Sequence, residues 1–285
     1  MREMTAVQEI QPVGSDFNLD DYDNMVGTMD WEKVKEHFTW HKTGKVNMVH
    51  EAIDRHVEEG KANKTAFIFE DTERSESYTF EELKTLTCRF ANGLKKKGVQ
   101  KGDRVFIFMP RSPELYIAMI GILRIGAIAG PMFEAFMEEA VRERLSDSGA
   151  KAVVTVPELY ERIPVNDLPN LEFIVLANTE ETTDEKQILF SDLMSHSDDY
   201  VMEWVDREDG MLLIYTSGST GKPKGVLQVH DAMIHQYIGG KWVYDLKEDD
   251  VFWCTADPGW VTGTSAGMWS PRSEEHTSEL QSPLI

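Results

Sequence analysis

The sequence has 285 residues, with 29 basic and 50 acidic side chains and a formal net charge of −21 at pH 7. Hydrophobic residues make up 41% and charged residues 28%, which is typical of a globular chain with one large or two smaller domains and argues against a disordered or fibrous protein. The negative charge repels phosphate backbones and anionic lipid surfaces, so we expect no nucleic-acid partner and no membrane partner.

The cysteine content and the N-terminal residues indicate the compartment. Cys88 and Cys254 are too few for a disulfide framework, and the start MREMTAVQEIQP lacks the apolar run of a secretory signal. The longest apolar stretch, residues 115–133, is interrupted by Arg124 and several glycines, so it falls short of a membrane span. We therefore expect a cytoplasmic protein. The histidines lack zinc-ligand spacing, so we expect no zinc site.

Three regions are predicted along the chain. Residues 1–29 are acidic and rich in turn residues, and we expect them to form a loosely held arm. Residues 30–271 alternate short apolar runs with amphipathic segments, a pattern typical of repeated β–α units. Residues 272–285 have neither an apolar strand pattern nor a helical one.

The central region predicts an α/β fold with mostly parallel sheets covered by helices. Strands are expected at residues 65–69, 103–109, 127–133, 152–156, 173–176, 211–215, 226–229 and 251–255, with residues 71–77 as a turn. Helices are expected in a short segment opening at residue 30 and at residues 46–57, 80–97, 113–124, 138–145 and 232–242. Several of the strands are apolar on both faces, as buried parallel strands are, and the intervening helices are long enough for crossovers.

Capping residues mark two of the helices. Thr79 and Glu82 have the spacing of a capping box, and Gly98 follows the end of the same helix. Ser112 and Pro113 occupy the N-cap and first positions of the next helix.

Several other polar residues are interpreted as structural. His230 and Asp231 precede a helix, and we expect Asp231 to be its N-cap. Cys254 lies between apolar neighbours and is expected to be a small core residue. Four arginines lie in or beside amphipathic segments, where a solvated side chain is the default, namely Arg111, Arg124, Arg142 and Arg162.

The segment TSGSTGKPKG, residues 216–225, is flanked by apolar strands and carries the chemistry. It contains four hydroxyls, three glycines and two lysines, so it offers many donors and positive charge to one anion. A lysine about 4 Å from a phosphate oxygen gains about 4 kcal/mol at an effective dielectric constant of 20. Distant acidic side chains are screened beyond about 8 Å, so we expect this loop to bind a polyphosphate despite the net charge.

Two alternative interpretations apply to this loop. A shorter SGST string would favour a surface linker, whereas the complete string between two strands favours phosphate binding. A Walker A loop is excluded because Gly218 and Gly221 are too close together and Pro223 follows Lys222. Ordinary P-loop hydrolysis is therefore disfavoured.

Residues 213–224 resemble the AMP-binding signature of the adenylate-forming superfamily, which includes acyl-CoA synthetases, luciferases and peptide-synthetase adenylation domains. The stretches FIFMPRSPELY, IGAIAGPMFEAF and WCTADPGWVTG resemble the bacterial AMP-forming acetyl-CoA synthetases, also called acetate–CoA ligases. The resemblance covers residues 30–271. It implies the N-terminal, incomplete part of the large domain of the adenylate-forming fold.

The resemblance also implies an activity. Relatives use ATP and Mg²⁺ to convert a carboxylate into an acyl-adenylate with release of pyrophosphate, and then transfer the acyl group to coenzyme A. We therefore expect an acetate–CoA ligase whose small-molecule substrates are acetate or another short acid, ATP and coenzyme A. The alternatives are a synthetase for longer or branched acids, a peptide-synthetase adenylation domain, and a non-catalytic remnant that binds a nucleotide or a partner.

Two groups of site residues are implied by the resemblance. Residues expected at the β- and γ-phosphates are Thr216, Ser217, Gly218, Ser219, Thr220, Gly221, Lys222 and Lys224. Lys224 and Thr220 are the expected catalytic members, Thr220 on the metal side, whereas Lys222 could equally face solvent. The expected walls of the acyl pocket are Trp260, Val261, Thr262 and Gly263. The alternative for this second segment is a buried turn in which Trp260 packs in the core.

The resemblance ends at residue 271. The tail RSEEHTSELQSPLI, residues 272–285, looks like unrelated nucleic acid translated after a truncation, as adapter or cloning junctions produce. The alternative is a genuine short, solvated C-terminus. The family's later adenine- and ribose-binding stretches, an acidic metal-binding residue and a small domain with a catalytic lysine would then be missing. We expect the fragment to be inactive, poorly soluble and weak in nucleotide affinity without the C-terminal half of its own chain.

Overall fold

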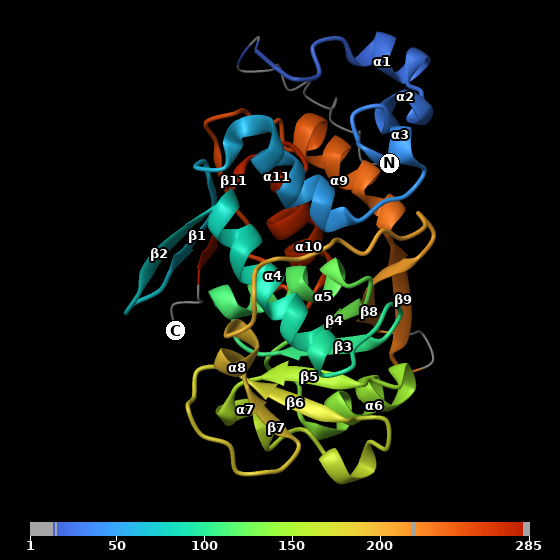
Figure 1. Ribbon diagram of the computed structural model, residues 1–285. Coiled ribbons are helices and arrows are strands. Elements are labelled where there is room, and N and C mark those ends of the chain that lie inside the picture. The colour runs from blue at the N-terminus through green and yellow to red at the C-terminus, as the bar shows by residue number, and fades with distance from the viewer. Residues whose placement is uncertain (1–13, 15, 218–220, 282–285) are drawn as a thin grey trace.

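The computed structural model describes residues 14, 16–217 and 221–281 (Figure 1). Within these residues the strands form two sheets, and the helices of the central region pack around them. The α/β class expected from the sequence is confirmed. None of the helices in this described part is both long and apolar enough to cross a membrane.

The larger sheet has seven strands in the order β7-β6-β5-β3-β4-β8-β9. Their bounds are β3 Arg104–Phe108, β4 Ile128–Pro131, β5 Ala152–Thr155, β6 Phe173–Leu176, β7 Gln187–Leu189, β8 Gly210–Thr216 and β9 Lys224–Val229. All neighbouring pairs run parallel except β8 and β9, which are antiparallel. The expected mostly parallel sheet is therefore confirmed, with a hairpin at one edge.

The helices that accompany this sheet are α4 Phe80–Lys96, α5 Pro113–Arg124, α6 Glu138–Ser148, α7 Pro157–Tyr160 and α8 Phe190–Met194. Of these helices, α4 and α5 begin where the capping residues predict. The Thr79 side chain accepts a hydrogen bond from the Glu82 backbone, and the Glu82 carboxylate accepts one from the Thr79 amide at 2.8 Å. Helices α4 and α5 approach so closely that a Cβ at Gly121 would lie 2.7 Å from the Phe90 ring.

A buried ion pair connects α4 and α5 to a segment near the N-terminus. Arg124, at the end of α5, donates to both carboxylate oxygens of Asp54 at 2.7 and 2.8 Å, and its Nε donates to Thr87 of α4 at 2.8 Å. The expectation of a solvated Arg124 is wrong, because the residue is fully buried. Asp54 ends a π-helical turn, His50–Asp54, so the pair ties the N-terminal region to the helices of the large sheet.

The smaller sheet has the order β10-β11-β1-β2. Its strands are β1 Thr65–Glu70, β2 Ser75–Thr79, β10 Val251–Trp253 and β11 Thr277–Gln281. Residues 75–77 were expected in a turn but belong to β2, which pairs antiparallel with β1. Strand pairing uses backbone groups, so the polar SES sequence can still form an edge strand.

Strand β11 lies in the tail, where the sequence predicts no strand. It pairs parallel with both β1 and β10, because its backbone fills the gap between their edges. Arg272 is fully buried. The alternative of a solvated C-terminus is therefore wrong at this residue. The foreign origin of residues 272–285 remains a prediction.

Most of the remaining helical segments lie before β1 or after β9. The remaining segments are α1 Tyr22–Thr28, α2 Trp31–Lys35, α3 Trp40–Thr43, α9 Met233–Ile238, α10 Val261–Thr264 and α11 Ser270–Arg272, with further turns at His50–Asp54, Val57–Lys61, Val165–Asp167, His230–Ala232, Gly239–Val243 and Ser265–Trp269. Part of the expected arm is anchored, because the Asn18 side chain donates to the carbonyls of Lys241 and Leu246 at 3.0 and 2.8 Å.

Candidate functional site

The expected phosphate loop connects β8 to β9 at one edge of the large sheet. Thr216 and Lys224 are cross-strand partners, as are Tyr215 and Gly225, so the sheet register fixes both ends of the loop. Strand β8 is largely buried, whereas β9 is mostly exposed at the edge of the sheet. Three expected phosphate ligands, Gly218, Ser219 and Thr220, lie outside the described residues.

The described residues of this loop that are expected to bind phosphate are open to solvent. All of them are exposed, namely Thr216, Ser217, Gly221, Lys222 and Lys224. Gly221 has a φ of 86°, a left-handed conformation that favours glycine, and no atom lies within 4 Å of the position of a Cβ there. The hairpin is therefore accessible to an anion rather than buried beneath helices.

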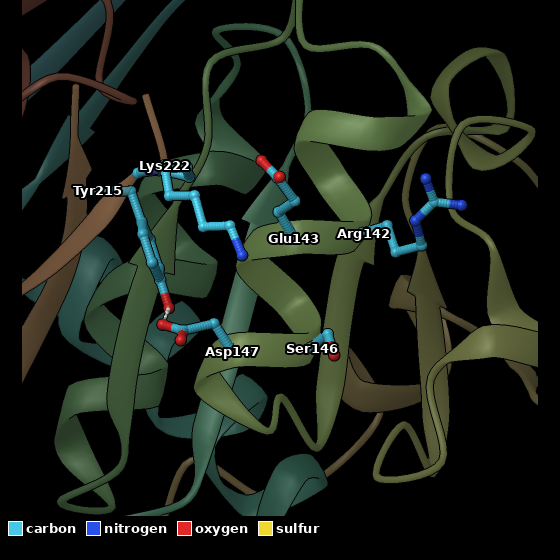
Figure 2. Close-up of a pocket in the computed structure, with 7 residues that line it drawn as sticks. Arg142, Glu143, Ser146, Asp147, Tyr215 and Lys222 are labelled. Atoms are coloured by element: carbon cyan, nitrogen blue, oxygen red, sulfur yellow. Dashed lines mark hydrogen bonds between the residues drawn. The ribbon is translucent and has the colours of Figure 1, made fainter. Parts of the chain in front are cut away.

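A cavity of about 400 Å³ separates this hairpin from α6 (Figure 2). Its lining residues are Arg142, Glu143, Ser146, Asp147, Tyr215, Lys222 and Pro223. Figure 2 shows the Lys222 side chain extending from the hairpin toward α6, on the side of Asp147. The exposed lysine thus borders a cavity that also contains acidic side chains.

Tyr215 anchors the base of the hairpin to α6. Its hydroxyl donates to Oδ2 of Asp147 at 2.6 Å, and the Arg144 guanidinium lies 5.7 Å from the centre of its ring. Burial and the neighbouring Asp147 carboxylate raise the pKa of Tyr215, so the hydroxyl stays protonated and donates. Asp147 of α6 therefore fixes the position of Tyr215, the residue directly before Thr216.

The second candidate segment, Asp257–Gly263, follows β10. Trp260 and Val261 are 47% and 46% exposed, so the alternative of Trp260 as a core residue is wrong. Thr262 is also exposed, whereas Gly263 is buried, and a Cβ there would lie 2.1 Å from the Asp257 carbonyl oxygen. The Trp260 ring centre lies 6.0 Å from that of Phe133.

Arg111 and Asp257 fix the turn that leads to Trp260. Asp257 Oδ1 accepts a hydrogen bond from the Gly259 amide at 2.7 Å, and Arg111 Nη2 donates to the Thr255 carbonyl at 2.8 Å. Arg111 Nε lies 3.8 Å from Asp257 Oδ2. Burial raises the pKa of Asp257, and the Gly259 hydrogen bond and the Arg111 charge offset part of this increase.

The two candidate segments come from different sheets, the hairpin from the large sheet and the Trp260 turn from the chain after β10. Sequence reasoning missed Tyr215, Asp147 and Arg111. Arg111 carried one usable signal, because it directly follows an apolar parallel strand, where open α/β sheets place functional loops.

The residues interpreted as structural have partly different roles. His230 is buried, its Nδ1 accepts from the Met48 amide at 3.0 Å, and burial lowers its pKa to about 4. Asp231 makes no helix-capping bond but accepts two bonds of 2.8 Å from Arg207, so the predicted N-cap is wrong. Across the described ranges, no group of three or more His, Cys, Asp or Glu side chains is arranged to hold a metal.

A mostly parallel sheet that ends in an exposed hairpin of hydroxyls, glycines and lysines is the arrangement expected of an α/β protein that binds phosphate. The model of the family described as AMP-binding enzyme matches residues 53–278. The chain belongs to this family.

Curated relatives are acetyl-coenzyme A synthetases. The protein from Bacillus subtilis (strain 168) is 52% identical over 267 residues, which cover 93% of this chain and 47% of the relative. The protein from Pseudoalteromonas translucida (strain TAC 125) is 38% identical over 85% of this chain and 40% of its own length. The chain thus spans about half the length of the curated relatives it matches.

The fold is also similar to a solved structure. The crystal structure of an acyl-CoA synthetase from Brucella canis matches with a TM-score of 0.84 and 29% identity. The match covers 93% of this chain and 48% of that protein. The adenylate-forming fold expected from the sequence is therefore confirmed for this part of the chain.

Proposed function

We propose that this chain is the N-terminal part of an ATP-dependent acetate–CoA ligase, which forms acetyl-AMP and pyrophosphate and then acetyl-CoA. The observation that supports this most strongly is the exposed hairpin with Lys224 opposite Thr216, in a chain 52% identical to an acetyl-coenzyme A synthetase. The proposed small-molecule substrates are acetate or a short acyl acid, ATP and coenzyme A, and the proposed compartment is the cytoplasm.

The hairpin supplies what formation of a mixed anhydride requires. A carboxylate is a weak nucleophile, so the reaction depends on a held pyrophosphate group and on neutralised charge rather than on a covalent nucleophile. Lys224 and Lys222 would neutralise phosphate charge, while Thr216, Ser217 and the backbone at Gly221 would donate hydrogen bonds. The proposal extends this role to Gly218, Ser219 and Thr220 outside the described residues. Mg²⁺, when bound, would neutralise further phosphate charge.

The Trp260 turn would provide the wall of the acyl pocket. Trp260 and Val261 present apolar surface, and the buried Gly263 lets the chain pass close to Asp257. An acid with a short alkyl chain would fit against such a wall by apolar contact. A synthetase for longer or branched acids remains the alternative, because the depth of the pocket also depends on segments beyond this chain.

Exposed apolar side chains on two edge strands suggest that a further protein segment packs against this chain. Val226 and Leu227 on β9 and Val251 and Trp253 on β10 are 47–52% exposed. Unpaired edges with apolar side chains pair readily with further strands. We propose that the C-terminal half of the parent chain covers them, and that residues 30–271 form a partial large domain after the arm at 1–29.

Pyrophosphate exchange in a chimera tests this function. Residues 1–271 are joined to the C-terminal part of the Bacillus subtilis relative, and exchange is measured with acetate, propionate, butyrate, isobutyrate and hexanoate. We expect exchange that depends on acetate and is lost in Lys224→Ala. Exchange without any acid, or full exchange in Lys224→Ala, would contradict the proposal, and a preference for hexanoate or isobutyrate would favour the alternative substrate class.

A further inference from the structure

Arg111 connects the two sheets beside the exposed Trp260 turn. It lies in the loop between β3 and α5, yet it contacts Thr255 and Asp257, which follow β10 of the other sheet. The side chains of Arg111 and Asp257 are only 11% and 13% exposed. Withdrawing a guanidinium and a carboxylate from water costs free energy, so their pairing restricts where both groups can lie.

Hydrogen bonds within the turn link the position of Asp257 to that of Trp260. The Asp257 carboxylate accepts from the Gly259 amide, and the Asp257 carbonyl accepts from the Trp260 amide at 2.9 Å. A Cβ at Gly263 would lie 2.1 Å from that same carbonyl oxygen. A displacement of Asp257 would therefore displace Trp260, because the backbone has no spare room.

A third loop packs behind the same turn. A Cβ at Gly259 would lie 2.4 Å from the Phe133 amide nitrogen, and Phe133 also faces the Trp260 ring. Glu134 follows Phe133, and burial together with the Asp257 charge raises its pKa. The Arg111 charge lowers the pKa of both Glu134 and Asp257, so it offsets the repulsion between these two carboxylates.

We propose that Arg111 is a positioning residue that holds the turn 257–260 and thereby sets the place of Trp260 as the wall that selects short carboxylic acids. This inference rests on the proposed acyl pocket and adds the residue that shapes it. In this role Arg111 acts through its contacts with Thr255 and Asp257. The planar guanidinium contacts both partners at once, which a lysine ammonium cannot reproduce.

Site-resolved oxidation of Trp260 in the 285-residue chain tests this role. Each acid from acetate to hexanoate is titrated, and the loss of Trp260 oxidation gives its apparent dissociation constant. Trp253, which is 50% exposed on β10, serves as the internal reference. In the unsubstituted chain we expect short acids to protect Trp260 selectively. In Arg111→Met we expect the ratio of dissociation constants between acetate and hexanoate to change by about tenfold.

Further variants separate positioning from folding. Asp257→Asn keeps an acceptor for the Gly259 amide and removes the charge that attracts Arg111, so we expect the same change in selectivity. Arg111→Lys should recover only part of it. Arg89→Met removes an arginine whose side chain is 41% exposed on α4 and should leave the selectivity unchanged.

The outcomes separate the two proposals. Selectivity that is unchanged in both Arg111→Met and Asp257→Asn, with normal cooperative unfolding, would overturn the role of Arg111. If no acid protects Trp260 in the unsubstituted chain, the acyl pocket itself is wrong and the inference falls with it.

Discussion

Lys224 lies directly opposite Thr216 in the β8–β9 hairpin, so the position of this lysine is set by strand pairing. Lys222 belongs to the loop itself and borders the cavity next to α6. We therefore predict that Lys224→Ala weakens pyrophosphate binding by about 1.5–3 kcal/mol, or roughly 10- to 150-fold, as expected for a charge-assisted hydrogen bond. Lys222→Ala should have a smaller effect. Titration calorimetry of both variants measures the difference, and equal or reversed losses would contradict the assignment.

The pair formed by Arg124 and Asp54 predicts a large loss of stability. Asp54→Ala leaves a fully buried guanidinium without its carboxylate, and we expect the free energy of unfolding to fall by about 3–5 kcal/mol. The exposed pair of Arg89 and Asp198, 3.6 Å apart, provides the control, and Asp198→Ala should change stability by less than about 1 kcal/mol. Urea denaturation measures the free energy of unfolding of both variants. Similar losses would show that the buried pair contributes no more to stability than the exposed pair.

The buried His230 is expected to make the stability of the fold sensitive to acid. Burial lowers its pKa from 6.5 to about 4, so the folded state disfavours the protonated ring. This contribution to stability is complete above pH 6.5 and decreases as the pH falls toward 4, by about 3 kcal/mol in total. His56, whose pKa burial lowers to about 3, acts in the same direction. We expect His230→Gln to reduce the slope of stability against pH between 6.5 and 4, as measured by chemical denaturation. An unchanged slope would contradict this role.

Substitution by alanine is expected to have different main effects at two glycines. Gly263→Ala places a Cβ 2.1 Å from the Asp257 carbonyl, so the turn must shift, and we expect a loss of about 1–3 kcal/mol in stability. Gly221→Ala meets open space but requires a positive φ, so it should cost only about 1 kcal/mol and mainly weaken pyrophosphate binding. Thermal unfolding and pyrophosphate titration of both variants test this contrast. A stable Gly263→Ala protein would be inconsistent with the packing of the turn.

Features set by neighbouring residues could be predicted from the sequence. The capping box of Thr79 and Glu82 depends on a spacing of three residues, and the parallel strands follow from apolar runs between helices. The hairpin loop was also found, because its residue types are concentrated within one segment.

Features set by distant segments could not be predicted. Arg124 is buried against Asp54, which lies 70 positions away in the sequence, and Asp231 pairs with Arg207 instead of capping a helix. Strands β2 and β11 lack an apolar pattern and form by pairing with strands already in place. The contacts of Arg111 with the chain after β10 likewise depend on how the two sheets meet.

Protection of Lys224 by nucleotide is the most direct test of the central claim that the hairpin holds a polyphosphate. The chain is treated with an amine-acylating reagent with and without ATP or pyrophosphate, and the modification of each lysine is measured by mass spectrometry. We predict that both ligands protect Lys224, and Lys222 to a lesser degree, while exposed Lys45, paired with Asp206, reacts unchanged. Equal modification of Lys224 with and without saturating ATP and pyrophosphate would contradict the account.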